Sequence, residues 1–311
     1  MNQIEIGKQI IREELNSNIK KLSQLGGGSI NSVFLVELEK STIVLKINDS
    51  LRFPGMFENE KKGLLKLNKS GVITPQVIFE RSKDNLAFLA LEYVPNGNLK
   101  NWELFGKKLA ILHTNKNEFF GLDYDNYIGS LKQINKNENN WKDFYSNQRL
   151  LHLTKFAFDK ELLSKTDSKK LEEICLKLDV YIPFSKPSLI HGDLWSGNLI
   201  FNSEGEPVFI DPAIYYGHPE MDWAMLSLFG SFPEAAMKSY CNIIPLENNY
   251  FEREKIYQLY PLLVHLFLFG KSYYRNVSEI LNFYRWFKIL IRIVRNLKVI
   301  FMKGYLKWPG R

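Results

Sequence analysis

Three segments in the first third of the chain have the hydrophobic pattern of β-strands. One alternates along its length, one is a β-branched run that contains a single lysine, Lys46, and one is a continuous apolar run that ends at Glu92. Short apolar or alternating segments of this kind are typical of strands. In order, the predicted strands cover residues 33–38, 43–47 and 86–91.

Apolar residues at helical spacing predict two helices around these strands. The first places Phe57, Leu64 and Leu67 on one buried stripe, and the second starts near Trp102 and has its apolar positions three and four residues apart. Each pattern indicates a helix with one buried face. Between residues 132 and 140 the chain is rich in lysine and asparagine instead, and we expect a solvated loop there.

Composition limits the class of protein further. The chain has 311 residues and 45% hydrophobic content, enough for a sizeable core. Its net charge of +7 is spread along the sequence without an interleaved basic and aromatic array, so no nucleic-acid partner is expected. The two cysteines, Cys175 and Cys241, form no motif and indicate a reducing environment.

No segment has the pattern of a membrane span or a secretion signal. The longest apolar run, 262–269, is interrupted by His265 and is too short to cross a bilayer. The N-terminus lacks an apolar core of signal-peptide length. We therefore expect a soluble, cytoplasmic protein.

The stretch His191–Asn198, followed by Asp211 in a Phe-Ile-Asp-Pro sequence, contains the most informative residues of the chain. Asp193 can orient a hydroxyl nucleophile and accept its proton. Asn198, five positions later, and Asp211, eighteen positions later, can hold magnesium. Their order and spacing match the catalytic loop and metal-binding turn of the protein-kinase-like fold, in the variant found in small-molecule kinases.

Two upstream features fit a kinase that uses ATP. The residues Gly26, Gly27, Gly28 and Ser29 precede the first predicted strand and could let backbone N–H groups approach phosphates, although a glycine triplet is also typical of a plain turn. Lys46 would contact the α- and β-phosphates and pair with a glutamate on the next helix.

Two glutamates of that helix could pair with Lys46. Glu60 is the better candidate because it lies beside the buried stripe, whereas Glu58 fits a solvated face. Two further residues have expected structural roles: His113 in capping or packing, and Asp222 in bracing the catalytic loop.

The chain resembles the fructosamine kinase (ketosamine-3-kinase) family over about residues 4 to 285. The matching segments include 56–60, 120–130, 140–145, 189–199, 210–222 and 229–233. The sequence Asp-Tyr-Asp-Asn-Tyr-Ile-Gly-Ser at 123–130 and the tryptophan within His-Gly-Asp-Leu-Trp-Ser-Gly-Asn distinguish this family from aminoglycoside and choline kinases.

The resemblance implies a two-lobed protein-kinase-like α+β fold. Its β-rich, ATP-binding lobe would cover residues 1–94. A mainly helical catalytic and substrate lobe would cover 95–311, with 289–311 beyond the family match. Nucleotide would lie in the cleft between the lobes.

The resemblance also implies site residues. Asp193 would be the catalytic base, and Asn198 and Asp211 the magnesium ligands. The phosphate-orienting pair would be Lys46 and Glu60. The adenine hinge would be Glu92, Tyr93 and Val94. Trp195 is a candidate platform for the sugar, with a core tryptophan that braces the loop as the alternative, and the substrate pocket would also involve the loop at His218.

The function implied is ATP-dependent phosphorylation of the sugar O3 of a ketosamine, such as a fructosamine, ribulosamine or erythrulosamine, free or attached to a protein. Phosphorylation would lead to deglycation.

Two departures from the family concern regulation and specificity. Ser29 stands where some members have cysteine, and Val264 and Phe267 stand where relatives tend to have asparagine.

Two other functions remain open from sequence. A small-molecule kinase of the aminoglycoside or choline type would share Asp193, but it gives no reason for the Asn-Tyr-Ile-Gly run at 126–129. A pseudokinase scaffold would bind nucleotide without catalysis, yet such proteins usually lose residues equivalent to Lys46, Asp193 or Asp211, all of which are present.

The segment 286–302 is largely apolar with a basic stripe at Arg292, Arg295 and Lys298. It could be a last helix packed on the large lobe, a dimer contact or an element that lies on an anionic membrane surface. We favour the packed helix, and the sequence leaves the role of this segment and the oligomeric state open.

Overall fold

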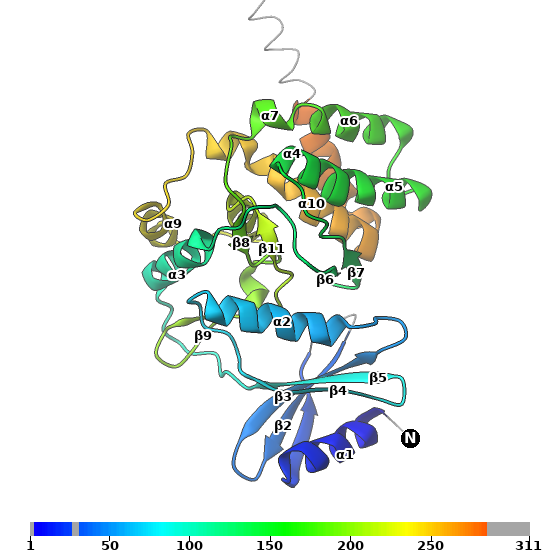
Figure 1. The fold of residues 1–311 in the computed structure, drawn as a ribbon, viewed down its shortest axis with the longest axis vertical. Coiled ribbons are helices and arrows are strands. Elements are labelled where there is room, and N and C mark those ends of the chain that lie inside the picture. The colour runs from blue at the N-terminus through cyan, green and yellow to red at the C-terminus, as the bar shows by residue number, and fades with distance from the viewer. Residues whose placement is uncertain (1–2, 27–30, 285–311) are drawn as a thin grey trace, which may run out of the picture. The chain divides into compact units, whose positions relative to one another are not determined.

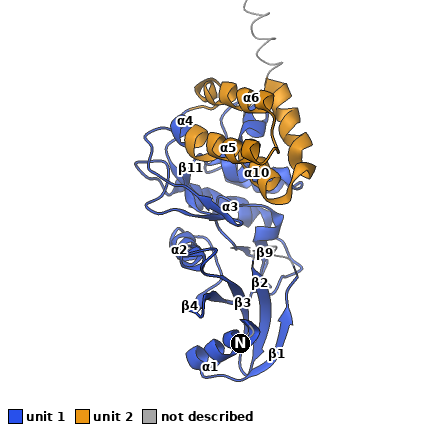
Figure 2. Ribbon diagram, turned by 90° about the vertical axis from the view of Figure 1, so that its right-hand side faces the viewer, with its two compact units in different colours: residues 1–144, 184–258 blue, residues 145–183, 259–311 orange. Residues whose placement is uncertain are grey.

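The computed structural model describes residues 3–26 and 31–284, which belong to two compact units (Figure 2). Unit 1 comprises residues 1–144 and 184–258, and unit 2 comprises 145–183 and 259–311. Unit 1 contains an antiparallel sheet and several helices, and the described part of unit 2 is helical. The α+β class expected from the sequence is confirmed, whereas the expected division between residues 94 and 95 stays a prediction.

A five-stranded antiparallel sheet forms the N-terminal part of unit 1, with the order β1-β2-β3-β5-β4 (Figure 1). All three strands predicted from hydrophobic pattern lie within this sheet. The strands are β1 (Ile19–Gln24), β2 (Ser32–Leu38), β3 (Thr42–Asp49), β4 (Val77–Lys83) and β5 (Leu86–Glu92).

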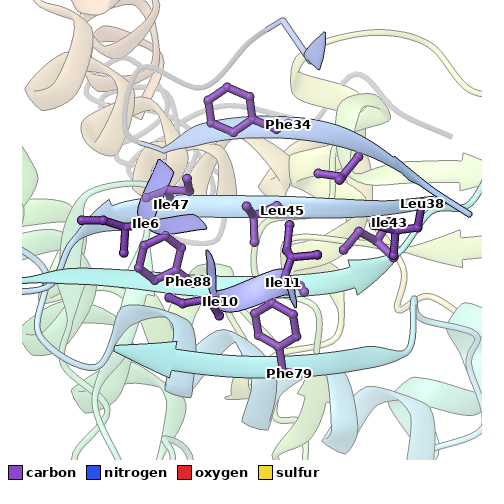
Figure 3. Packing of buried hydrophobic residues seen from close by; sticks show 12 residues of the cluster. Ile6, Ile10, Ile11, Phe34, Leu38, Ile43, Leu45, Ile47, Phe79 and Phe88 are labelled. Carbon is purple, nitrogen blue, oxygen red and sulfur yellow. The ribbon is translucent and has the colours of Figure 1, made fainter. Parts of the chain in front are cut away.

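Two helices cover opposite faces of the sheet (Figure 1). On one face, alternate β3 residues from Ile43 to Ile47 pack with α1 (Gln3–Leu15) in a buried apolar cluster (Figure 3). The residues between them, including Lys46, point to the other face, because successive strand side chains alternate. That face is covered by α2 (Met56–Lys69). Strand alternation therefore directs the one lysine of this run toward α2.

The second predicted helix is α3 (Trp102–Thr114). It begins after Asn101, whose side-chain oxygen accepts a hydrogen bond from Leu104 N over 2.9 Å, a normal N-cap. The other elements that lie wholly in unit 1 are short. They are β6 (Asn126–Ile128), β7 (Leu131–Gln133), α4 (Trp141–Asp143), β8 (Ser188–Ile190), η2 (Ser196–Asn198), β9 (Leu199–Phe201), β10 (Pro207–Phe209), β11 (Tyr215–Gly217), α8 (Glu220–Leu228) and α9 (Glu234–Cys241).

The short strands form three antiparallel pairs: β6 with β7, β8 with β11, and β9 with β10. The loop after β8 and the turn after β10 carry the catalytic-loop and metal-turn sequences. Because the chain from β9 to β10 is a hairpin, both sequences return to the same part of unit 1.

The described part of unit 2 is built from helices and from the second half of α10 (Tyr250–Phe269), which begins in unit 1. Residues 274–284 are also helical. At the start of α6, Ser164 and Asp167 form a reciprocal capping box, and Asp167 also accepts a hydrogen bond from the Tyr274 hydroxyl over 3.1 Å. The other elements are η1 (Phe144–Leu151), a π-helical segment, α5 (His152–Asp159), α6 (Lys165–Cys175), α7 (Leu178–Tyr181) and η3 (Lys271–Tyr273).

One expectation from the sequence was wrong. The segment 132–140 is not simply a solvated loop, because its first two residues complete β7, and the side chains of Gln133 and Asn135 are buried. Each makes hydrogen bonds inside unit 1, and these bonds compensate for the burial of its polar atoms. A prediction of exposure from polar composition alone does not take such partners into account.

The longest apolar run, 262–269, lies in α10. No helix within residues 3–26 and 31–284 is long and apolar enough to cross a membrane. The predicted amphipathic segment 286–302 lies outside the described residues.

Candidate active site

Lys46 in β3, Glu60 in α2 and Asp211 after β10 form an ionic cluster in unit 1. Nζ of Lys46 donates to Oε1 of Glu60 over 2.6 Å and to Oδ1 of Asp211 over 2.5 Å. Glu58 instead pairs with Lys62 on the helix surface over 2.7 Å. The prediction that Glu60, not Glu58, pairs with Lys46 is confirmed.

Burial and the two neighbouring carboxylates have opposite effects on the pKa of Lys46. Its side chain is only 7% exposed, and burial alone would lower the pKa of the ammonium group. The charges and hydrogen bonds of Asp211 and Glu60 outweigh this and hold the pKa of Lys46 well above its usual value. Burial raises the pKa of Glu60, an effect that Lys46 opposes and Asp211 reinforces. The cluster therefore keeps a fixed positive charge beside two carboxyl groups.

The loop after β8 carries Asp193, and η2, which follows, ends at Asn198. Nδ2 of Asn198 donates to the backbone oxygen of Asp193 over 2.8 Å and to its Oδ2 over 3.1 Å. Burial, with the neighbouring Asp211 carboxylate, raises the pKa of Asp193 to about 7, although the hydrogen bond from Asn198 opposes this shift. A carboxyl group with such a pKa can accept a proton near neutral pH.

A close backbone approach shapes the start of this loop. Gly192 has φ of +82°, and an added Cβ would lie 2.1 Å from the carbonyl oxygen of Ala213. Only glycine fits that position without moving the chain. The missing side chain lets the loop lie directly against the segment that follows Asp211, and the Ala213 N–H donates to His191 O over 3.0 Å.

Asp222 in α8 braces the loop from behind. Its carboxylate accepts hydrogen bonds from His191 N over 2.7 Å and from Gly192 N over 2.9 Å. His113 Nε2 lies 3.1 Å from Asp222 Oδ2, and its Nδ1 lies 2.8 Å from the Tyr240 hydroxyl. Burial alone would raise the pKa of Asp222, but these hydrogen bonds hold it below its usual value. The structural roles expected for Asp222 and His113 are confirmed.

His191 connects the loop to Ile210, the residue before Asp211. Its Nε2 lies 2.9 Å from Ile210 O, and its Nδ1 accepts a hydrogen bond from Asp193 N over 3.3 Å. Because Nδ1 is the acceptor, the proton of the neutral ring is on Nε2, which donates to Ile210. Burial lowers the pKa of His191 and favours this neutral form. The ring thus sets the position of Asp193 relative to Asp211.

Asp211 lies in a strained turn and suits a metal ligand. Its φ is +53°, uncommon for a residue with a side chain and often found at functional sites. Its side chain is 46% exposed, and only Oδ1 is engaged by Lys46. Asn198 uses its amide nitrogen on Asp193, which leaves its amide oxygen for a cation. One carboxylate and one amide oxygen fit Mg²⁺, which also takes phosphate and water oxygens.

The two predicted substrate residues differ in exposure. Trp195 is 38% exposed and meets Phe229 edge-on, with ring centroids 6.2 Å apart, so its side chain is only partly covered. His218 is 2% exposed, and its ring packs beside Tyr257 and Trp141. Direct contact between His218 and a sugar stays a prediction that this burial does not favour.

Of the remaining predicted nucleotide residues, the structure describes the hinge residues and Gly26. The hinge residues Glu92, Tyr93 and Val94 span the last residue of β5 and the two that follow; Glu92 N donates to Gln76 O over 2.9 Å. In the glycine-rich segment, Gly26 is exposed, whereas Gly27, Gly28 and Ser29 lie outside the described residues. The nucleotide contacts of both segments stay predictions.

Sequence reasoning missed a buried ion pair behind the site. Arg253 donates from Nε and Nη2 to the two carboxylate oxygens of Glu220 over 2.7 and 2.5 Å, and both side chains are buried. The pair joins the start of α10 to the start of α8, two residues before Asp222. In the sequence, these are one arginine and one glutamate near the starts of two helices, 33 residues apart. No local pattern predicts that two such residues form a pair.

Comparison with known proteins places the chain among sugar-amine kinases. The sequence profile described as fructosamine kinase matches residues 3–285. A protein from Enterococcus faecium named as a probable ketoamine kinase is 36% identical over 277 residues, covering 88% of this chain and 98% of that relative. The chloroplastic protein-ribulosamine 3-kinase of Arabidopsis thaliana is 32% identical over 294 residues, covering 91% and 88%.

Solved structures support the same relationship. A crystal structure from Thermobifida fusca, described as a candidate fructosamine-3-kinase, has a TM-score of 0.81 and 32% identity, covering 89% of this chain and 97% of that one. An aminoglycoside phosphotransferase bound to AMP-PNP and hygromycin B has a TM-score of 0.58 with 16% identity, covering 89% and 98%. This second likeness shows the fold alone.

Proposed function

Because the chain belongs to the fructosamine kinase family, we propose that it transfers the γ-phosphate of ATP to the O3 hydroxyl of a ketosamine. The observation that carries the proposal is the Lys46–Glu60–Asp211 cluster, within electrostatic range of an Asp193 whose pKa is raised to about 7. Phosphoryl transfer depends mainly on positioning and electrostatics, and these residues supply both.

The phosphates of ATP are held by charge. Lys46, oriented by Glu60, contacts the α- and β-phosphates, while the segment Gly26–Ser29 supplies backbone N–H groups. The backbone of residues 92–94 binds the adenine. Asn198 and Asp211 are the ligands that we propose for Mg²⁺, which neutralises phosphate charge when bound.

Asp193 acts on the sugar. Its carboxylate accepts a hydrogen bond from the O3 hydroxyl and takes the proton as the oxygen attacks the γ-phosphorus. The bond between the γ-phosphorus and the bridging β,γ-oxygen breaks, and ADP leaves with the bonding electrons. Asn198 keeps the carboxylate in place through its bond to Oδ2, so the base is oriented before substrate arrives.

The product explains why O3 is a useful acceptor. Loss of a proton from C1 gives an enaminol, the C3–O bond breaks, and inorganic phosphate leaves. Hydrolysis of the resulting imine at C1 releases the free amine. Phosphorylation would thus lead to deglycation of a small amine or a lysine side chain.

We propose that Trp195 binds the C–H face of the sugar, since an aromatic face suits that surface. Its exposure supports this role over that of a core tryptophan. The amine substituent would point away from the site, which allows a free or protein-bound substrate. A cytoplasmic location fits a chain whose two cysteines, Cys175 and Cys241, form no sequence motif.

The test is ADP release by the purified protein with fructosamine, ribulosamine, erythrulosamine, an aminoglycoside and choline as acceptors. We expect release with ketosamines, and with ribulosamine or erythrulosamine at least as well as with fructosamine, because each extra CHOH group must be desolvated and paired. Release only with an aminoglycoside or choline would refute the substrate and keep the kinase mechanism. ATP binding without release for any acceptor would favour a pseudokinase.

A further inference from the structure

Three buried side-chain amides gather beneath the segment that follows Asp211. Asn126, at the start of β6, donates from Nδ2 to the backbone oxygen of Ile214 over 2.8 Å. Its Oδ1 accepts hydrogen bonds from Gln133 Nε2 over 2.8 Å and Asn135 Nδ2 over 2.9 Å. Gln133 also donates to Ala213 O over 3.1 Å. The β6–β7 hairpin therefore holds the backbone two and three residues beyond Asp211.

The same hairpin also holds the N-terminal half of α2 and the residues just before that helix. Asn59, the neighbour of Glu60, donates from Nδ2 to the backbone oxygen of Asp125 over 3.0 Å. The Tyr127 hydroxyl donates to Pro54 O over 3.0 Å, and its ring meets Phe53 edge-on with centroids 6.5 Å apart. Figure 1 shows α2 between the five-stranded sheet and this hairpin.

Helix α2 also touches the Asp211 turn directly. An added Cβ at Gly63 would lie 3.2 Å from Cγ of Pro212, so the helix packs closely on the residue after Asp211. Beyond the helix, Phe209 N donates to Ile73 O over 2.8 Å. The C-terminal side of α2 is thus tied to β10, and the hairpin supplies the second tie, close to Glu60.

We propose that the β6–β7 hairpin, with Asp125, is a clamp that fixes α2 relative to the Asp211 turn, and that Asn59, Asn126 and Tyr127 are positioning residues for the bound nucleotide. The clamp acts through Glu60, which orients Lys46, and through Asp211. This inference rests on the proposed function. It assigns the family-specific run 123–130 a role in positioning the phosphates of the nucleotide.

Two ties are needed for a mechanical reason. Without the hairpin, the α2 contacts to the Asp211 turn and β10 described above lie at Gly63 and beyond, and a small rotation of α2 moves Glu60 away from Lys46. The bond from Asn59 lies one residue from Glu60 and resists that rotation. In kinases, the lysine–glutamate pair must be in place for phosphate positioning. Here the clamp would keep it formed before any ligand binds.

The experiment measures the dissociation constant of AMP-PNP with magnesium for variants that weaken the clamp at its rim. Asn59→Ala removes one hydrogen bond to the hairpin, and Tyr127→Phe removes the hydroxyl but keeps the ring on Phe53. One lost hydrogen bond should weaken nucleotide binding about two- to tenfold. Asn117→Ala is the matched control, because Asn117 also donates to one backbone carbonyl, Phe119 O over 3.2 Å, in an exposed loop.

A double variant separates positioning from general stability. If the clamp acts through Glu60, the double variant should bind AMP-PNP as weakly as Glu60→Gln alone. Asn59→Ala would then have no further effect, because the charged Lys46–Glu60 pair that the clamp maintains is already lost. Full additivity of the two changes would overturn the proposal. So would a lower Tm in both Asn59→Ala and Tyr127→Phe with unchanged nucleotide affinity, since that is the signature of a structural role.

Binding of AMP-PNP requires no acceptor, which keeps this test independent of the substrate. A wild-type protein that binds nucleotide but phosphorylates no ketosamine would refute the proposed function and leave the clamp to be judged by the variants. A competent ketosamine kinase with equal affinity in Asn59→Ala, Tyr127→Phe and Asn117→Ala would refute the clamp alone.

Discussion

At the scale of single residues, the site contains two aspartates with opposite pKa shifts. The carboxyl group of Asp193 is difficult to ionise, whereas the carboxylate of Asp222 is stabilised by the hydrogen bonds that it accepts. Asp193 shares its surroundings with Asp211, and burial raises its pKa to about 7. Asp222, equally acidic in isolation, has a lowered pKa because it accepts hydrogen bonds from the loop it supports. The two aspartates differ in role because their hydrogen-bond donors differ.

The raised pKa of Asp193 predicts a pH-dependent cost to folding. Its pKa is about 7 in the folded protein and about 3.9 in an unfolded chain, so the folded state disfavours the ionised form. The wild type should lose stability as pH rises from about 4 to about 7. Asp193→Asn does not titrate, so its Tm should exceed that of wild type by about 2 °C or more at about pH 8, and by less at about pH 5.

This measurement uses nucleotide-free protein with a chelator, because magnesium would favour the ionised carboxylate. An identical Tm difference at both pH values would contradict the account of Asp193.

Trp195→Ala should raise KM for the ketosamine by about tenfold or more and leave KM for ATP nearly unchanged, because an aromatic platform is lost only on the sugar side. Steady-state kinetics with each substrate varied in turn provide the test. Phe251→Ala is the control, since Phe251 is a 72% exposed aromatic residue outside the site. A larger effect on ATP than on the sugar would exclude the platform role.

At the scale of elements, the site depends on short segments rather than on long helices. The catalytic loop follows a three-residue strand, and Asp211 follows another. Such segments have little stability of their own, so their conformation comes from hydrogen bonds to neighbours: Asp222 behind the loop, His191 between loop and strand, and the amides of the clamp below the Asp211 turn.

Asp222→Ala should destabilise the protein by about 3 kcal/mol or more, because two buried backbone N–H groups and His113 lose their acceptor. Urea unfolding gives the change in free energy of unfolding. Asp159→Ala, at an exposed position, is the control. If both variants cost less than about 1 kcal/mol, the bracing role would have to be abandoned.

Asp211→Asn should lose most of the magnesium-dependent part of the thermal shift produced by ADP. The change removes a ligand charge, while asparagine still tolerates the positive φ of this turn. The shift by ADP with a chelator should persist, because adenine contacts remain. Equal magnesium dependence in the wild type and the variant would remove Asp211 from the metal site.

At the scale of the whole molecule, the features that could be predicted from the sequence are those that have a local residue pattern or a recognisable motif. The kinase-like order of motifs correctly predicted that Lys46 pairs with a glutamate of α2, and the apolar stripe of α2 correctly selected Glu60. The resemblance over about residues 4 to 285 agrees with the family profile over 3–285.

Long-range polar contacts could not be predicted in the same way. The run 132–140 looks solvated because polar side chains usually face water, and burial of Gln133 and Asn135 becomes understandable only with their partners known. The pairing of Glu220 with Arg253 is equally non-local. These contacts connect elements that sequence patterns describe one at a time.

The measurement closest to the central claim follows the substrate itself. A peptide with one ribulosamine-modified lysine is incubated with the protein, ATP and magnesium, and is analysed by mass spectrometry over time. We predict a mass increase of one phosphate group, localised to sugar O3 by NMR, followed by recovery of the unmodified lysine. Asp193→Asn should slow the first step by about two to four orders of magnitude. Phosphate on any other hydroxyl, or no phosphorylated peptide while ADP accumulates, would contradict the account.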